Sequence, residues 1–493
     1  MQNTDSSALV WLRRDLRLED NAALAAALQS GARLHCVFVL DRAILDALPR
    51  ADRRVEFILS TLAGLDAQLR ALAGHARAGL IVRHGWAVDE IPQLAAELGV
   101  HTVVCAHDYE PQALARDAQV QAALARQRIA WRSVKDHVVF ERQEVLTQTG
   151  KPYGVFTPYL RAWLARVGES LVPEHDCSAL GRALVPRPAG LAKPPPSLPD
   201  IGFEPTNLQA LGILPGAAGA QALLADFAPR MRAYEEARNF PAVKGPSYLG
   251  VHLRFGTVSI RQLVNRALPA HRAGDQGASV WLAELVWREF YAQILANFPH
   301  VAGASFKSEY DAIVWEQGEI AHSRFAAWCE GRTGYPLVDA AMAQLHQSGY
   351  MHNRLRMVAG SFLVKHLGID WRWGERHFAQ HLNDFDLSAN NGGWQWVSSS
   401  GCDAQPYFRI FNPMSQSEKF DAAGKFIRRY VPALAALDAK HIHAPWLAPA
   451  LVLQAAGVQL GGNYPHPVVD HATARAATLA RYGVLKNKAA PAG

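Results

Sequence analysis

The first 140 residues alternate short β-rich runs with Ala/Leu-rich stretches of helical spacing, whereas strand signals vanish after about residue 220. Alternating strands and helices are typical of a parallel sheet covered by helices on both faces. The long helical part that follows cannot belong to such a sheet. The chain therefore predicts an α/β domain followed by an all-helical domain, with expected strands at Ala8–Leu12, Leu34–Leu40, Leu80–Arg83 and Val100–Ala106.

Prolines are dense between Pro173 and Pro215, which predicts a long linker with little regular structure. A length of 493 residues also favours two domains over one. The predicted organisation is an α/β domain at 1–140, a linker at 141–219, a helical domain at 220–486 and a short tail at 487–493.

Composition narrows the class of protein. The net charge of +6 fits a polyanionic partner, although many basic proteins bind no nucleic acid. Five scattered cysteines without a CxxC pair predict neither a disulfide framework nor a zinc site. No apolar run is long enough to span a bilayer, so we expect a cytoplasmic protein without a membrane partner. The pairs His377/His381 and His441/His443 have metal-like spacing, but without an acidic or cysteine third ligand nearby no metal site is predicted.

The helical part is rich in tryptophan, with nine of the 13 tryptophans between Trp281 and Trp446. That concentration favours a flat aromatic ligand or stacked bases, and a tryptophan-rich helical core is the alternative. Four strings stand out: WLAELVWREFY (281–291), MHNRLRM (351–357), NDFDLSANNGGWQW (383–396) and PYFRIFNP (406–413). On a helix, Trp281, Glu284 and Arg288 would form one stripe.

These strings, with WLRRDLRLEDN near the start and GRTGYPLVDAAM at 331–342, resemble the photolyase/cryptochrome family from Val10 to about Arg481. Within the family, the chain is most similar to the bacterial class I branch that repairs cyclobutane pyrimidine dimers. The resemblance implies an N-terminal α/β antenna domain, a linker and a C-terminal helical domain that binds FAD noncovalently.

The resemblance also implies which residues bind the flavin. Arg356 should pair with Asp384 over the ring, and the neutral amide of Asn390 should face flavin N5. The pyrophosphate segment departs from the hydroxyl-rich family pattern, because Pro246-Ser-Tyr-Leu-Gly250 keeps only the Ser247 hydroxyl. Its backbone N–H groups can still cradle phosphate. The implied flavin residues are Tyr234, Ser247, Leu249, Gly250, Trp281, Arg288, Asn353, Arg356, Asp384, Asp386 and Asn390.

For the substrate, the resemblance implies a dimer that is extruded from UV-damaged DNA, as the general account of base flipping describes for photolyases. Trp287 and Trp396 would stack on the dimer, and Glu284 would hydrogen-bond one of its bases. Asn353 and Met357 would form the pocket wall. The candidates for phosphate contacts are Arg238, Arg354 and Arg409, each of which could instead be a solvated surface arginine.

Two further elements follow from the resemblance. Trp394, Trp371 and Trp315 align with a tryptophan chain that carries an electron to the flavin, although plain core packing is an alternative for Trp371. Glu110 aligns with a carboxylate that holds the pterin of a reduced folate. Because a Cys-Lys pair of one such site is Ala302-Gly303 here, the antenna chromophore stays open between a folate such as methenyltetrahydrofolate, a deazaflavin and none.

The function implied is light-dependent repair of cyclobutane dimers by a monomeric photo-lyase. Rival hypotheses are a cryptochrome photoreceptor, a (6–4) photolyase and a nucleotide-binding α/β module without photochemistry. In the (6–4) branch, histidines stand where Asn353 and Met357 stand here. His352 is expected about 100° away from that helix face, so no general acid is predicted in the pocket.

Overall fold

The computed structural model describes residues 7–485, and in that range the chain forms two compact units. The first unit contains residues 7–149, 160–229 and 247–296. The second contains residues 150–159, 230–246 and 297–485. The predicted tail at 487–493 lies outside the described residues.

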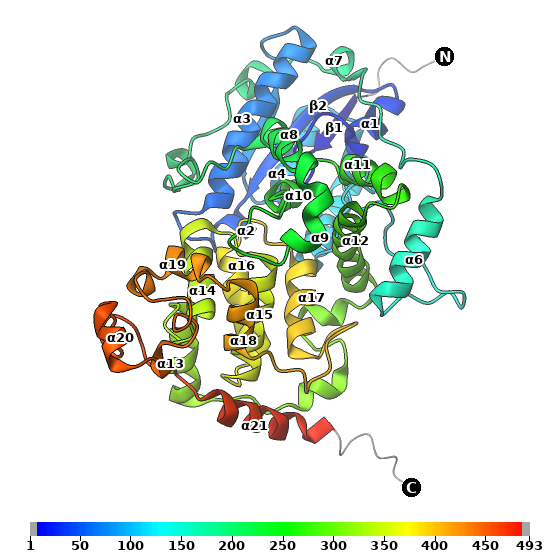
Figure 1. Ribbon diagram of the computed structural model, residues 1–493. Helices are drawn as coiled ribbons and strands as arrows, with labels where there is room; N and C mark the ends of the chain where they lie inside the picture. Colours follow the sequence, from blue (N-terminus) through cyan, green and yellow to red (C-terminus); the bar gives the residue numbers. More distant parts are fainter. Residues whose placement is uncertain (1–6, 486–493) are drawn as a thin grey trace. The chain divides into compact units, whose positions relative to one another are not determined.

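The first unit contains a five-stranded sheet in the order β3-β2-β1-β4-β5. Figure 1 labels β1 and β2 of this sheet. All its pairings are parallel, and β1 lies between β2 and β4. The strand order reverses between β1 and β4. In doubly wound sheets, ligands usually bind at the carboxyl ends of the two strands that flank such a reversal. The strands are β1 (Ser7–Trp11), β2 (Arg33–Asp41), β3 (Leu80–Gly85), β4 (Thr102–Ala106) and β5 (Ala130–Val134).

The sequence predicted β1 to β4 and missed β5. The segment Ala130–Val134 reads AWRSV, which contains no apolar run, and its side chains are only partly buried or exposed. It is also an edge strand, paired with β4 alone. An edge strand needs less apolar surface than a central one, so the signal used for the other strands is absent.

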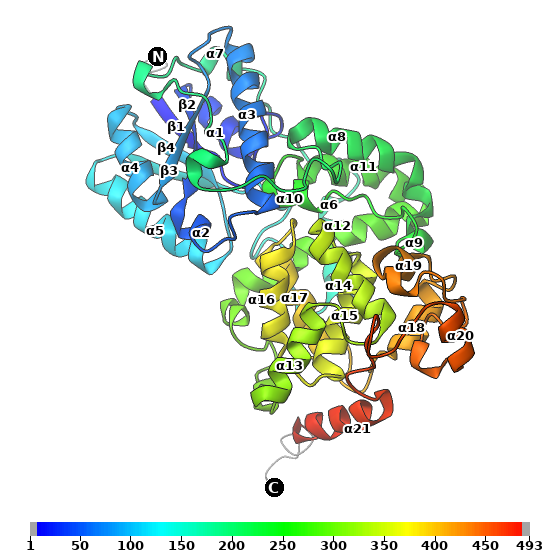
Figure 2. The same ribbon diagram turned by 90° about the vertical axis from the view of Figure 1, so that its left-hand side faces the viewer.

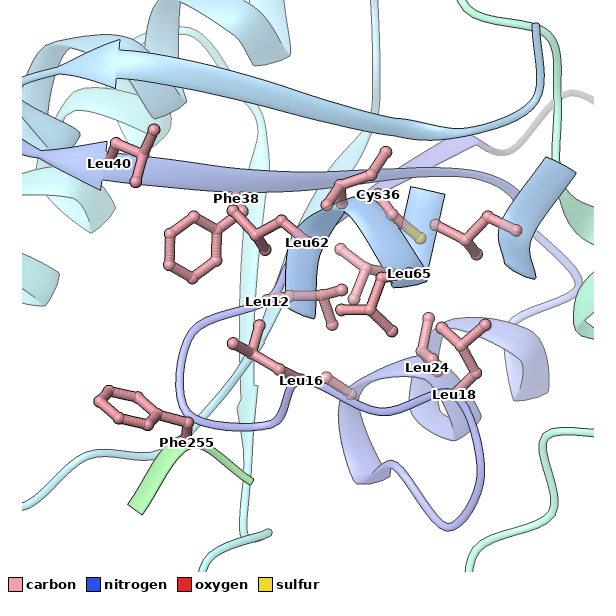
Figure 3. Close-up of a cluster of buried hydrophobic side chains, with 14 of the residues drawn as sticks. Leu12, Leu16, Leu18, Leu24, Cys36, Phe38, Leu40, Leu62, Leu65 and Phe255 are labelled. Atoms are coloured by element: carbon pink, nitrogen blue, oxygen red, sulfur yellow. The ribbon is translucent and has the colours of Figure 1, made fainter. Parts of the chain in front are cut away.

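Alternation along the strands builds a core on each face of the sheet. Ala8 and Val10 pack with residues of α1 (Ala22–Gln29) and α3 (Arg53–Ala73), whereas Leu9 and Trp11 pack with α4 (Ala87–Glu97) and α5 (Pro111–Arg126). Figure 2 shows α3 on one side of the sheet and α4 and α5 on the other. Figure 3 shows the first of these cores, where leucines of α3 meet Leu12, Cys36 and Phe38. The predicted α/β architecture is confirmed.

The predicted linker contains more regular structure than its prolines suggest. It includes α6 (Phe156–Val167) and the short α7 (Leu180–Ala183). Its later part is also held against the sheet: the N–H of Val185 donates to the Leu34 carbonyl at 3.1 Å, and Arg187 Nη1 donates to the Leu80 carbonyl at 2.6 Å. This segment is therefore part of the first unit. The remaining helices assigned mainly to that unit are α2 (Arg42–Leu45), α8 (Gly216–Phe227), α10 (Gly250–Phe255), α11 (Ile260–Arg272) and α12 (Gln276–Asn297).

The second unit is helical, as predicted. Trp328, Trp371 and Trp394 are almost fully buried in its core, so part of the tryptophan concentration is core packing. Among residues 7–485, no helix combines the length and apolarity needed to cross a bilayer. The helices are α9 (Tyr234–Ala237), α13 (Gly318–Cys329), α14 (Pro336–Ser348), α15 (Asn353–Lys365), α16 (Trp371–His381), α17 (Leu387–Ser398), α18 (Pro413–Phe420), α19 (Lys425–Tyr430), α20 (Ala450–Ala455) and α21 (His471–Tyr482).

Candidate active site

The predicted flavin residues are divided between the two units. Ser247, Leu249, Gly250, Trp281 and Arg288 belong to the first unit. The second unit contains the others: Tyr234, Asn353, Arg356, Asp384, Asp386 and Asn390. The second unit holds three of the four charged members, and Arg288 of the first unit is the fourth.

An ion pair joins α15 to the segment before α17. Arg356 Nη2 donates to both carboxylate oxygens of Asp384, at 3.0 and 2.9 Å. Arg356 Nε donates to the Met351 carbonyl at 2.9 Å, which fixes the guanidinium plane. The two side chains keep 29% and 19% of their surface exposed, so a ligand can reach them. The predicted pairing of Arg356 with Asp384 is confirmed.

Asp386 and Asn390 lie on the first turn of α17. Asp386 is the N-cap of this helix, and its Oδ1 accepts from the Ala389 N–H at 3.2 Å and from the Ser388 hydroxyl. The N–H of Asn390 donates to the Asp386 carbonyl at 2.9 Å. Asn390 Nδ2 donates to the Glu375 carbonyl at 3.1 Å, and this bond orients the side-chain oxygen as an acceptor.

Two amides of the NNGGWQW string have structural roles that the sequence did not reveal. Asn391 Nδ2 donates to the Val301 carbonyl and to Glu375 Oε1, both at 2.9 Å. Gln395, one turn later, donates to the same carbonyl at 3.1 Å and accepts from the Phe306 N–H at 2.8 Å. Both amides are buried, so they hold α17 against residues 301–306. Their spacing of four residues is the signal that could have indicated a shared face.

The predicted dimer-contact residues of the second unit lie on α15 and α17. Asn353 is the first residue of α15 and is exposed, whereas Met357 is half-buried one turn later. Arg354 Nη1 lies 3.9 Å from the Met357 sulfur. Trp396 is partly buried against the core of this unit. Met357 and Trp396 therefore both keep part of their surface exposed.

His352 differs from the expectation of a helix position turned away from Asn353. It precedes α15 as its N-cap, and its Nδ1 accepts from the Arg354 N–H at 3.2 Å. Burial and the charges of Arg354, Arg356 and Arg238 lower the pKa of His352 to about 4. The ring is therefore neutral at pH 7 because it is buried, whereas the prediction had excluded it on helix geometry.

Trp394 fits into a slot between α15, α16 and α13. Its ring lies 4.9 Å from Phe378 and 6.0 Å from Trp328, centroid to centroid. A Cβ atom at Gly374 would lie 2.1 Å from Trp394 Cη2, so glycine is needed at that position. Among residues 7–485, the buried indole N–H of Trp394 has no hydrogen-bond partner. Of the other predicted relay residues, Trp371 has the Arg372 guanidinium 4.7 Å over its ring, and the ring of Trp315 lies 6.2 Å from that of Tyr482.

The three predicted phosphate-binding arginines differ in their surroundings. Arg409 is exposed. Arg354 Nη2 donates to Asn239 Oδ1 at 2.6 Å, and its guanidinium lies 4.4 Å from the Phe420 ring centre. Arg238 lies 5.4 Å over the ring of Tyr234. Arg354 is thus braced at the surface, whereas Arg409 is the better candidate for a simple phosphate contact.

In the first unit, α12 carries the predicted stripe. Trp281 is buried, and its ring lies 4.9 Å from Phe227. Glu284, Trp287 and Arg288 are partly exposed, and Arg288 Nη1 donates to the His137 carbonyl at 2.5 Å. The stripe therefore begins with a buried tryptophan and continues with partly exposed polar and aromatic side chains.

Glu289, inside the WREFY string, is a structural residue that the sequence analysis missed. Its carboxylate is buried and accepts from the Val139 N–H at 2.7 Å, the Phe140 N–H at 3.0 Å and the Trp163 indole N–H at 2.6 Å. A buried carboxylate with three donors is stable only when all three are in place. Glu289 therefore fixes α12 to the segment after β5.

The predicted pyrophosphate segment leads into α10. Tyr248 has a φ of 58°, in the left-handed region, and Leu249 is buried. Gly250 is the first residue of α10. Ser247 and Gly250 are partly exposed, as residues that contact a phosphate must be.

Comparison with known proteins identifies the family. Residues 8–177 match the family described as DNA photolyase, and residues 281–484 match the FAD binding domain of DNA photolyase. The chain is 40% identical over 491 residues to the deoxyribodipyrimidine photo-lyase of Vibrio cholerae, which covers 97% of this chain and 99% of that protein. This chain belongs to the DNA photolyase family.

Solved photolyase and cryptochrome structures share its fold. A class III photolyase from Agrobacterium tumefaciens superimposes with a TM-score of 0.87 at 36% identity and 98% coverage of both chains. A Synechocystis cryptochrome gives a TM-score of 0.82 at 28% identity, with coverage of 97% of this chain and 100% of that one. Most predicted flavin residues of this photolyase lie inside the matched FAD-binding domain, whereas Tyr234, Ser247, Leu249 and Gly250 precede it.

In this photolyase the predicted antenna residue Glu110 follows the carboxyl end of β4, and the strand order of the sheet reverses between β1 and β4. Glu110 Oε1 accepts from Arg14 Nη1 at 3.1 Å and from Arg254 Nη1 at 2.6 Å. Its side chain keeps 20% exposure. The carboxylate is thus anchored by two arginines at the position where doubly wound sheets bind ligands.

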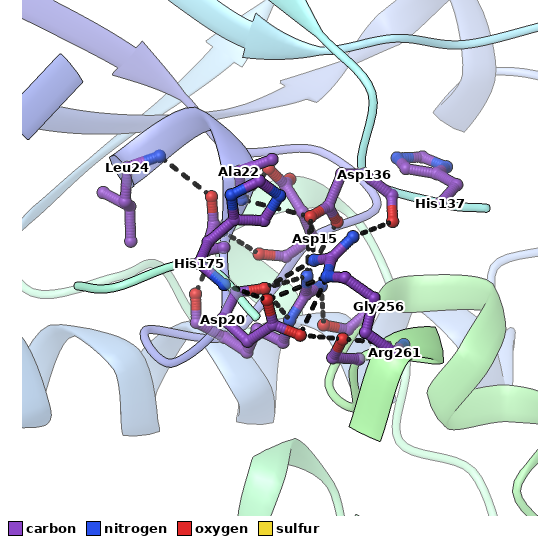
Figure 4. Close-up of polar contacts among 12 residues, drawn as sticks. Asp15, Asp20, Ala22, Leu24, Asp136, His137, His175, Gly256 and Arg261 are labelled. Carbon is purple, nitrogen blue, oxygen red and sulfur yellow. Dashed lines mark hydrogen bonds and ion pairs between the residues drawn. The ribbon is translucent and has the colours of Figure 1, made fainter. Parts of the chain in front are cut away.

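The opening string WLRRDLRLEDN supplies a buried ion network in this photolyase (Figure 4). Arg261 Nε donates to Asp20 Oδ1 at 2.8 Å, and its Nη2 donates to Asp136 Oδ1 at 2.8 Å. Arg17 Nη2 donates to Asp136 Oδ1 at 2.7 Å. Loss of one partner in such a network leaves a buried charge unpaired, so these residues stabilise the first unit.

The two histidine pairs of the sequence analysis behave differently. His441 pairs with Asp438, with Nδ1 2.9 Å from Oδ2. The argument that no acidic or cysteine third ligand lies near His377/His381 was wrong, because the fold brings Cys329 to 3.5 Å from His377 Nδ1. It also brings His346 beside the pair. These residues are remote in sequence, which is why spacing alone gave no signal.

Proposed function

We propose that this chain is a light-dependent deoxyribodipyrimidine photo-lyase that splits cyclobutane pyrimidine dimers in UV-damaged DNA. The observation that carries the proposal is the match of both photolyase families together with the Arg356–Asp384 pair and Asn390 in the matched FAD-binding domain. When bound, reduced FAD supplies the light-excited electron that opens the cyclobutane ring.

The chemistry of the second unit's donor set fits a reduced flavin. The guanidinium of Arg356 provides a fixed positive charge that stabilises an anionic ring, and Asp384 holds it in place. Asn390 presents its side-chain oxygen because its Nδ2 is bound by the Glu375 carbonyl. An amide oxygen accepts from an N–H without adding a charge, as a reduced N5–H requires.

The chain's own residues would bind and orient the lesion. Trp287 and Trp396 offer partly exposed indoles for stacking, and Glu284 offers a carboxylate acceptor for a base. Asn353 and Met357 form a pocket wall that cannot donate a proton at pH 7. Opening a cyclobutane ring breaks two carbon–carbon bonds and moves no hydroxyl or amino group, so no general acid is needed.

Undamaged duplex DNA would be bound mainly through electrostatic attraction between arginine side chains and its phosphates. The net charge of +6 and the exposed side chain of Arg409 support contacts to phosphate. Arg238 and Arg354 are the second and third candidates. The prediction that the enzyme acts as a monomer is checked by light scattering during gel filtration.

Electron supply and light harvesting complete the proposal. Trp394, Trp371 and Trp315 would relay an electron from the surface to the oxidised cofactor. Glu110 would hold an antenna chromophore, for which methenyltetrahydrofolate is the first candidate. Its two arginine partners would compete with that role unless one of them also contacts the chromophore.

Repair in light and dark tests the proposal. The purified protein is loaded with FAD, reduced and mixed with an oligonucleotide that carries one thymine dimer. We expect the dimer to disappear only under blue light. A protein that retains FAD and binds the lesion but leaves it intact in light would favour a cryptochrome-type photoreceptor, and a protein that takes up no FAD would favour the α/β module without photochemistry.

A further inference from the structure

Three histidines of the second unit gather their ring nitrogens at one point. His346 lies on α14, and His377 and His381 lie one turn apart on α16. One ring nitrogen of each lies within 4.8 Å of those of the other two. We call His346, His377 and His381 the three-histidine cluster. It is separate from every residue assigned above to the flavin, the lesion or DNA.

The distances in the three-histidine cluster resemble those of a metal site. His346 Nε2 lies 3.3 Å from His377 Nε2. Two nitrogens that each lie about 2.0–2.1 Å from a tetrahedral Zn²⁺ are roughly 3.3–3.4 Å apart. The remaining separations, up to 4.8 Å, close by small rotations of imidazole rings that are only partly buried. The spacing of four residues places His377 and His381 on one helix face, as two-histidine metal motifs require.

The outer contacts orient the rings for metal binding. His381 Nδ1 lies 2.8 Å from the His377 carbonyl and can only donate to it, so Nε2 carries the lone pair. His377 Nδ1 lies 3.5 Å from Cys329 Sγ, which leaves Nε2 of this ring directed at His346. Partners of this kind on the second ring nitrogen are typical of histidine ligands.

Metal ions bind the neutral imidazole through its unprotonated ring nitrogen. The competing explanation for the 3.3 Å contact is a hydrogen bond from one Nε2–H to the other Nε2.

We propose that the three-histidine cluster is a binding site for a divalent transition-metal ion, with Zn²⁺ as the first candidate. Three imidazoles suit Zn²⁺, Cu²⁺ or Ni²⁺ and do not suit Mg²⁺ or Ca²⁺, which prefer oxygen ligands. All three residues are partly exposed, so water can fill the fourth position. The bound ion would tie α14 to α16. It would not take part in repair.

Metal titration of the whole protein tests this proposal. The full chain is produced without a histidine tag, loaded with FAD, stripped with a chelator and titrated with Zn²⁺ by calorimetry. Metal content after gel filtration is measured by elemental mass spectrometry. Mg²⁺ serves as the oxygen-preferring probe. We expect one Zn²⁺ per chain and no binding of Mg²⁺.

Single variants assign the site. His346→Gln, His377→Gln and His381→Gln should each weaken Zn²⁺ binding, by about tenfold or more, because loss of only a ligand's outer partner costs about 10–100-fold. His471→Gln is the matched control, because His471 Nδ1 lies 2.9 Å from His366 Nε2 in a histidine pair outside the cluster. It should bind Zn²⁺ like the parent protein.

Two further measurements distinguish the loss of a metal ligand from misfolding of a variant. His381 is the last residue of α16, so its replacement leaves the helix interior intact, and circular dichroism checks each variant. In the parent protein, Zn²⁺ should raise the melting temperature, and it should not do so in the His346→Gln/His381→Gln double variant. A parent protein that binds no Zn²⁺, or a double variant that binds it equally well, would overturn the proposal and leave a hydrogen-bonded histidine pair.

Discussion

His352 shows how burial sets a protonation state beside Asn353, one of the predicted dimer-contact residues. Its pKa is about 4 in the folded chain, against about 6.5 in an unfolded one. Between pH 4 and pH 6.5 the unfolded chain binds more protons at His352 than the folded chain does. The contribution of the neutral, buried ring to the free energy of unfolding is therefore complete above pH 6.5 and is lost as the pH falls through 4.

His352→Asn tests this assignment. Asn can keep the N-cap bond to the Arg354 N–H but cannot titrate. Between pH 7 and pH 4 the free energy of unfolding should fall less in the variant than in the parent protein, by up to about 3 kcal/mol. Urea unfolding followed by tryptophan fluorescence measures it. Equal losses in the two proteins would show that His352 is not buried as a neutral ring.

Trp394 is the residue of the proposed electron relay that is expected closest to the flavin. Trp394→Phe should abolish light-driven reduction of the oxidised cofactor by external donors, while repair by chemically reduced enzyme persists. Trp371→Phe should do the same. Trp328→Phe is the matched control, because Trp328 lies 6.0 Å from Trp394 but outside the proposed relay. Loss of photoreduction in Trp328→Phe, with retention in Trp371→Phe, would move the relay from Trp371 to Trp328.

Trp396 and Arg409 separate recognition of the lesion from attraction to DNA. Trp396→Ala should weaken binding to dimer-containing DNA by about 1–3 kcal/mol and leave undamaged DNA nearly unaffected. Arg409→Ala should weaken both kinds of binding and reduce the salt slope by about one. Fluorescence anisotropy at several salt concentrations measures both variants. If Trp396→Ala loses affinity equally for the two DNAs, it does not contact the dimer.

At the scale of elements, the packing of α16 against Trp394 depends on a residue without a side chain. Gly374→Ala would place a Cβ 2.1 Å from Trp394 Cη2 and 2.6 Å from Leu363 Cδ2. Overpacking of this kind costs about 1–3 kcal/mol. Gly64→Ala in α3 is the matched control, because nothing lies within 4 Å of its added Cβ. There alanine should stabilise the protein by about 0.5–1 kcal/mol. Thermal unfolding of the two variants should shift in opposite directions, and equal shifts would contradict the slot.

The elements that the sequence predicted are those with a strong local signal. β1 to β4 are apolar runs in a buried sheet, and their order along the chain was sufficient to predict a parallel α/β domain. β5 was missed because a polar edge strand has a weak signal, and α6 was missed because it lies in the segment 141–219 that was assigned to the linker. The N-cap role of His352 was also missed, since the start of α15 could not be placed to one residue.

At the scale of the whole molecule, the candidate site could be predicted only where long strings matched a family. The Arg356–Asp384 pair joins residues 28 positions apart, and the resemblance supplied it. His346 and His377 are 31 positions apart and belong to no such string, so their contact emerged only from the fold. The assignment of the predicted flavin residues to two compact units was likewise not visible in the linear sequence.

The lesion that the enzyme repairs tests the central claim most directly. Matched oligonucleotides that carry a cyclobutane dimer or a (6–4) product are incubated with the fully reduced enzyme under the same light, and each lesion is followed by chromatography. Because Asn353, Met357 and the neutral His352 cannot act as a general acid, only the cyclobutane dimer should be converted to two thymines. Clean conversion of the (6–4) product, or survival of the cyclobutane dimer in light, would contradict this account.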